Sequence, residues 1–98
     1  MNIDIFTSKD AVANVQSYYD KKLNEQSLEL ISILNDIFEQ IEKASLCGKY
    51  IINIKQDISN IKNEYFFISE YLIHKCGYDC KIYSTLHKDI LDIVIIWR

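Results

Sequence analysis

Four side chains that can bind metals or act as nucleophiles lie close together in the second half of the chain, namely His74, Cys76, Cys80 and His87. Thiolate and imidazole are ligands that zinc prefers, but structural zinc sites usually present paired ligands such as C-x2-C. His74 and Cys76 are two residues apart on an expected helix, so they point to different sides. The alternative is that the histidines lie on the surface and the cysteines are small apolar core residues. We expect no metal site, and a small metal or thiol enzyme is the least favoured function.

Other catalytic arrangements are also missing from the sequence. A cysteine nucleophile needs a base within hydrogen-bond reach and an oxyanion site, and the surroundings of Cys76 and Cys80 indicate neither. The chain has only two glycines and no glycine-rich loop, which argues against a P-loop or dinucleotide site. We therefore predict no catalytic residues, no cofactor and no enzymatic activity.

One carboxylate has an unusual position. Asp92 shares a face of the apolar run 90–97 with Ile90, Val94 and Ile96. It lies either near a sheet edge in contact with water, which is the interpretation we favour, or beside a lysine from a neighbouring strand.

Tyrosine is abundant in a chain of this size. Tyrosine is enriched at interfaces because it adds contact area with a polar tip. Half-buried positions on the rim of the monomer are the other explanation. The seven residues are Tyr18, Tyr19, Tyr50, Tyr65, Tyr71, Tyr78 and Tyr83.

Length, composition and charge limit the class of protein. The 98 residues, 49% of them hydrophobic, fit a single globular domain, 1–98. Net charge is −3 and the basic residues are scattered, which argues against nucleic acid as a partner. No apolar run approaches the length of a membrane span and no signal peptide is evident, so we expect a cytoplasmic protein without a membrane partner. Three cysteines, an odd count, are typical of reduced thiols.

Residues 7–47 have a helical pattern. Thr7 and Asp10 form a capping box ahead of apolar residues at helical spacing. The pattern loosens near Asn24 and resumes up to Gly48, whose type commonly ends a helix. Either two helices or one bent helix satisfies this pattern.

Residues 49–98 have the pattern of a βαββ unit. Strand-like runs occupy 49–55, 79–85 and 90–97, with a helix capped by Asp57 or Ser59 and ended by Gly77. The last run is apolar on both faces, which is typical of a central strand covered on both sides. The sequence therefore predicts an α+β fold: an N-terminal helix or helix pair, then a split β-α-β-β unit with sheet order 1-3-2.

The apolar stripe in the second part of this helical pattern, between Asn24 and Gly48, is wider than packing against a single neighbour requires. Its residues form a near-heptad seam with additional flanking apolar positions, and a homodimer would cover the second flank. The predicted interface consists of Leu30, Ile31, Leu34, Ile37, Phe38 and Ile41.

Several short motifs resemble those of a group of short bacteriophage proteins. They are Thr7-Ser8-Lys9-Asp10-Ala11, Gly48-Lys49-Tyr50, Gly77-Tyr78 and the closing Ile95-Ile96-Trp97. The resemblance implies a non-enzymatic accessory protein in the host bacterial cytoplasm that binds a host protein, in host takeover or anti-defence. Sequestration of a small signalling ligand and a role as a virion or assembly component remain alternatives.

Overall fold

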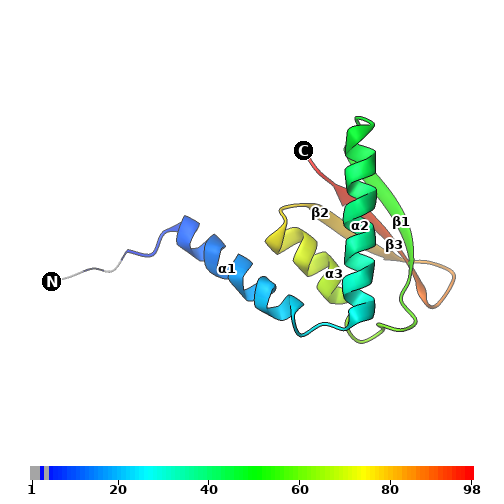
Figure 1. Ribbon diagram of the computed structural model, residues 1–98, viewed down its shortest axis with the longest axis horizontal. Coiled ribbons are helices and arrows are strands. Elements are labelled where there is room, and N and C mark those ends of the chain that lie inside the picture. The colour runs from blue at the N-terminus through cyan, green and yellow to red at the C-terminus, as the bar shows by residue number, and fades with distance from the viewer. Residues whose placement is uncertain (1–2, 4) are drawn as a thin grey trace.

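The structure is a computed structural model that describes residues 3 and 5–98, and Figure 1 shows the arrangement of its elements. Helices and a three-stranded sheet follow one another as the sequence predicts, which confirms the α+β class and the N-terminal helix pair. The elements are α1 (Ser8–Leu23), α2 (Leu28–Leu46), β1 (Ile51–Asp57), α3 (Phe66–Glu70), a π-helical turn η1 (Tyr71–Lys75), β2 (Asp79–Ser84) and β3 (Ile90–Ile96).

Side-chain caps set the start of both long helices. The Thr7 hydroxyl accepts a hydrogen bond from the Asp10 N–H at 3.2 Å, and the Asp10 carboxylate accepts one from the Thr7 N–H at 3.1 Å. Ser27 caps α2 by accepting from the Leu30 N–H at 3.2 Å. The N-terminal part is thus two helices separated by a short turn, not one bent helix.

The sheet has the predicted order, β1-β3-β2, with β3 antiparallel to both neighbours. Ile93 at its centre lies opposite Ile54 of β1 and Ile82 of β2. Gly48 and Gly77 have positive φ angles of 78° and 79°, which ends the helix before each strand.

One face of the sheet is covered by helices. Leu91, Ile93 and Ile95 of β3 are buried on this face, and α2 crosses the strands in Figure 1. The prediction of a helical layer on each side is wrong. The opposite face, which we call the open face, carries half-buried Val94 between Asn53 and Lys81 and half-buried Ile96 between Ile51 and Asp79. Lys81 lies directly opposite Val94 on this face, where the aliphatic stem of a lysine can cover apolar surface while its ammonium group stays in water.

The third helical region is shorter than expected. Turns occupy most of the segment before Phe66, and Asp57 accepts a hydrogen bond from the Ser59 N–H at 2.8 Å. Three apolar residues in and beside this region, Ile61, Ile68 and Leu72, are nevertheless buried in the core.

Helix α1 lies outside these two layers. It contains no buried residue, and it packs on η1 through its C-terminal half. Its N-terminal half extends away from the body of the molecule in Figure 1. The whole described chain measures 60 × 34 × 22 Å along its principal axes.

Candidate functional site

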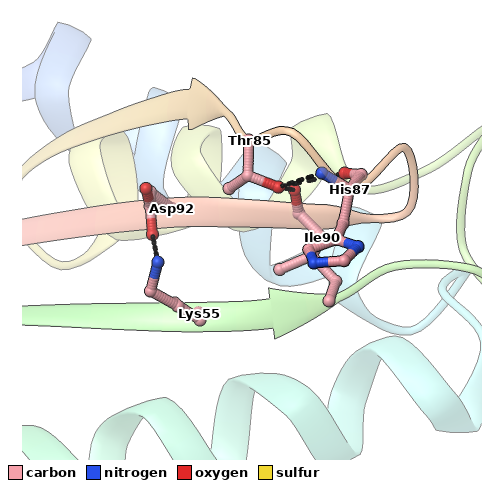
Figure 2. Close-up of polar contacts among 5 residues, drawn as sticks. All are labelled: Lys55, Thr85, His87, Ile90 and Asp92. Atoms are coloured by element: carbon pink, nitrogen blue, oxygen red, sulfur yellow. Dashed lines mark hydrogen bonds and ion pairs between the residues drawn. The ribbon is translucent and has the colours of Figure 1, made fainter.

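The structure does not gather the four metal-type residues into one site. His74 and Cys76 lie at the end of the η1 region, Cys80 on β2, and His87 in the β2–β3 hairpin. Within residues 3 and 5–98, no group of three or more His, Cys, Asp or Glu side chains is placed to hold a metal ion. In the hairpin the His87 N–H donates to the Thr85 hydroxyl at 3.1 Å, and that hydroxyl donates to the Ile90 carbonyl at 2.8 Å (Figure 2).

The cysteines are all free thiols, and two of them have a raised pKa. Burial raises the pKa of Cys80 to about 11. Burial also raises the pKa of Cys76, against the smaller effect of the Lys75 ammonium. Both side chains are therefore protonated at neutral pH, which is opposite to what a thiolate nucleophile requires.

Asp92 lies on the central strand, so the favoured interpretation of a residue near the sheet edge is wrong. Lys55 of β1 lies directly opposite, with its Nζ atom 3.5 Å from Asp92 Oδ1 (Figure 2). This confirms the alternative, a lysine from a neighbouring strand. The Oδ1 atom is shielded from solvent and makes no hydrogen bond within the described chain, so the ammonium group offsets the cost of burying it.

Most of the predicted α2 interface belongs to the core of the single chain. Leu30, Leu34, Ile37 and Ile41 are at most 6% exposed without a second copy. Ile31 and Phe38 are half-buried, and Phe38 packs against the core. The four buried side chains belong to one core cluster with residues of the sheet and α3, and α2 is in contact with β1.

The largest group of uncovered apolar side chains lies instead at the start of the chain. Among residues 3 and 5–98, fourteen large hydrophobic residues are exposed, and six of them precede residue 19. These six are between 42% and 81% exposed, and they define what we call the N-terminal apolar row: Ile3, Ile5, Phe6, Val12, Val15 and Tyr18.

This row continues into a groove between α1 and η1, which we call the aromatic groove. The groove has a volume of about 430 Å³ and is wide open to solvent. It is lined by Asn14, Val15, Tyr18, Tyr19 and His74.

Aromatic packing forms the floor of the groove. The Tyr19 ring stacks on His74 with centroids 5.3 Å apart, and Tyr18 meets Tyr19 edge to face at 5.2 Å. Burial, with a smaller contribution from Glu70, raises the pKa of Tyr19. Its hydroxyl therefore remains protonated and can donate a hydrogen bond to a ligand group.

Polar contacts fix α1 on η1 below the groove. The Lys75 ammonium lies 2.9 Å from Asp20 Oδ2, and the Gln16 side-chain amide donates to the Lys75 carbonyl at 3.5 Å. In η1 the Cys76 N–H donates to the Tyr71 carbonyl, five residues back, which is the π-helical spacing. Such turns are frequent at functional sites.

Only part of this site could be recognised from local sequence patterns. Val12, Val15 and Tyr18 recur every third residue, and Tyr18 and Tyr19 belong to the tyrosines singled out above. The packing of α1 on η1 depends on tertiary contacts, and the π-helical turn has no recognised local motif.

No helix among residues 3 and 5–98 is long and apolar enough to cross a membrane. Comparison of the chain with known protein families, curated proteins and solved structures finds no match.

Proposed function

We propose that the chain is a non-enzymatic binding domain that docks a protein partner on the N-terminal apolar row and the aromatic groove. The observation that carries this proposal is the exposure of six large hydrophobic side chains, 42% to 81% each, along one short segment. Grouped apolar residues on a surface usually mark an interaction site.

The chemistry of the groove fits a protein partner. Tyrosine rings supply rigid contact area, and the Tyr19 hydroxyl, the Asn14 amide and the His74 imidazole surround them with polar groups. Aliphatic side chains of a partner helix or peptide would pack against Val15 and the tyrosine rings.

Sequestration of a small signalling ligand is the second candidate. Small-molecule sites usually enclose most of the surface of their ligand. The aromatic groove has a suitable volume, about 430 Å³, but it is open to solvent and favours a large partner.

The resemblance to short bacteriophage proteins suggests the biological setting. On that basis the partner is a host protein in a bacterial cytoplasm, and the activity is host takeover or anti-defence. A role as a virion or assembly component uses the same surface with a different partner.

The proposal is tested by capture of partners from bacterial lysate with the full chain. The variant Val12→Asp/Val15→Asp places two charges on the row, where they meet no buried neighbour. Leu86→Asp at the hairpin is the matched control, because Leu86 is fully exposed and remote in sequence from α1.

The wild type and the Leu86→Asp control are expected to retain the same protein, and Val12→Asp/Val15→Asp is expected to lose it. Circular dichroism checks that all three are folded. Equal capture by all three chains, or no capture by any of them, would contradict the proposal.

A further inference from the structure

Strand β1 forms an edge of the sheet that no other strand covers among the described residues. We propose that this edge pairs with the β1 strand of a second copy of the chain, giving a two-fold dimer with a continuous six-stranded sheet. An exposed edge strand presents unpaired N–H and C=O groups and is a template for such pairing.

Two hydrogen bonds show which backbone groups point outward. The Trp97 N–H donates to the Tyr50 carbonyl at 3.0 Å, and the Ile58 N–H donates to the Asp89 carbonyl at 2.7 Å. In an antiparallel pair every second residue bonds to the neighbouring strand, so even-numbered residues of β1 bond to β3. The N–H and C=O groups of Ile51, Asn53 and Lys55 therefore point away from the sheet, toward the free edge.

Charge selects one register for the dimer. If Asn53 lies opposite Asn53 of the second copy, Lys49 lies opposite Asp57 on both sides of the axis. If the second strand is shifted by two residues in one direction, so that outward backbone groups still meet, Lys49 lies opposite Lys55, which is a repulsive contact. The same shift in the other direction places Asp57 opposite the aliphatic Ile51.

The Asn53-centred register also satisfies the backbone and the aliphatic side chains. Three opposed pairs of outward residues give about six inter-subunit hydrogen bonds. Ile51, which is 51% exposed, lies against the aliphatic stem of Lys55 from the second copy. On the other face Ile52 lies opposite Ile54 of the second copy, which extends the core across the boundary.

Helix α2 adds a second layer of complementarity. At 100° per residue, one flank of α2 carries Glu29, Asp36, Gln40, Lys43 and Cys47, on the side away from Ile31 and Phe38. We call this the β1-edge flank, because three of its members line a groove beside the edge. That groove has a volume of about 440 Å³ and is lined by Gln40, Lys43, Ala44, Cys47, Lys49, Ile51, Ile52 and Asn53.

Charge on the β1-edge flank is acidic in the first half of α2 and basic near its end. The chain reverses at Gly48, so α2 and β1 run in opposite directions (Figure 1). A two-fold axis through Asn53 brings the first half of one α2 beside the second half of the other. Lys43 is paired with Glu39 of its own helix at 3.2 Å, and both side chains are exposed. In the dimer, Asp36 of each copy adds a second carboxylate on the side of Lys43 that faces the other copy, which favours this dimer over parallel arrangements.

The inference does not depend on the proposed function. Helix α1 packs on η1, which adjoins β2, so the aromatic groove and the β1 edge lie at opposite ends of the molecule (Figure 1). The dimer also differs from the one predicted from sequence, which used the Ile31 and Phe38 side of α2.

Sedimentation velocity of the full chain at tens of micromolar tests the proposal, with Asn53→Pro as the main variant. Proline removes the outward N–H at the centre of the edge and leaves the β1–β3 hydrogen bonds in place. The wild type is expected to sediment as a dimer and Asn53→Pro as a folded monomer. Ser84→Pro is the control, because the N–H of Ser84 points outward at the β2 edge by the same alternation and its side chain is exposed.

Lys49→Glu is a second variant that does not alter the backbone. It places two like-charge contacts across the axis, and the dissociation constant is expected to rise about tenfold or more. A wild type that remains monomeric throughout this range would overturn the proposal. A dimer that both Asn53→Pro and Lys49→Glu leave unchanged would overturn it equally, as would a dimer lost in the Ser84→Pro control.

Discussion

Burial decides what the cysteines can do. Cys80 lies opposite Ile95 on the covered face of the sheet and packs against the core. Cys47 follows the last turn of α2 and is exposed. A thiol reacts as its thiolate, so a residue held in apolar surroundings is slow to react even when reagent reaches it.

We expect Cys80 to resist alkylation at neutral pH. Its pKa of about 11 keeps the thiolate a very small fraction at pH 7.5, and the rate should rise roughly tenfold per pH unit until about pH 11. Timed alkylation by iodoacetamide, read by peptide mass spectrometry, measures this, with exposed Cys47 as internal reference. Equal rates at Cys80 and Cys47 at pH 7.5 would show that Cys80 is not shielded.

Leucine residues of α2 provide a direct test of which side chains form the core. Leu30 is fully buried, whereas Leu28 is 86% exposed. Leu30→Ala is expected to lower the free energy of unfolding by about 2–5 kcal/mol. Leu28→Ala should change it by less than about 0.5 kcal/mol. Urea unfolding gives both values, and similar losses for the two variants would contradict the assigned burial.

At the scale of elements, local signals in the sequence are sufficient for much of the fold. The Thr7–Asp10 box, the glycines at 48 and 77, and the strand runs each act within a few residues, and the elements that they mark form near their expected positions. The helix expected after Asp57 or Ser59 is the exception, because it begins only at Phe66. The apolar pattern of residues 90–97 was sufficient to predict that this strand lies at the centre of the sheet. The order 1-3-2 followed from the hairpin before it.

Elements that depend on tertiary contacts could not be predicted in the same way. The apolar residues of β3 were consistent with one covered face or two, and only the positions of α2 and α3 decide between them. Asp92 was misplaced because its partner, Lys55, is 37 residues away in the sequence. The aromatic groove was missed because it exists only where α1 packs on η1.

We expect the capping box of helix α1 to weaken at acidic pH, because the hydrogen bonds to the Asp10 carboxylate depend on its charge. Hydrogen bonds that the Asp10 carboxylate accepts from Thr7, first from its backbone N–H and then from its hydroxyl, hold the pKa of Asp10 below the usual value for an aspartate. Because the pKa of Asp10 is lower in the folded helix than in the unfolded chain, the ionised carboxylate stabilises the helix at pH values above the unfolded-state pKa. This stabilisation is lost as the pH falls through the folded-state pKa. The expected loss of order therefore begins below about pH 4.

Nuclear magnetic resonance of the α1 amides across pH 2–6 measures this effect. Chemical shifts of residues 8–11 are expected to move toward random-coil values, while those near Tyr19 change less. In the Asp10→Asn variant the shifts should no longer depend on pH in this range. A wild-type first turn that stays helical at pH 2 would contradict the role of Asp10.

For the whole molecule, the buried residues and the proposed binding residues occupy different segments. In the part of the chain that the structure describes, every buried residue lies between Leu30 and Ile95, and the large hydrophobics exposed before residue 19 lie outside that span. The body therefore folds around α2, α3, η1 and the sheet. Helix α1 is held by Tyr19, Leu23 and the Lys75–Asp20 ion pair.

This separation predicts that residues 25–98 fold without α1. Removing residues 1–24 takes away two partly buried hydrophobic side chains that pack against the core, Tyr19 and Leu23, which is expected to cost about 2 kcal/mol and lower the melting temperature by about 10 °C. Ser27 and its hydrogen bond to the Leu30 N–H remain, so α2 keeps its cap. Thermal unfolding followed by circular dichroism is the measurement, and a single cooperative transition is the expected result. A truncated chain with no cooperative transition would show that α1 is part of the folding unit, and the surface assigned to partner binding would then also be required for stability.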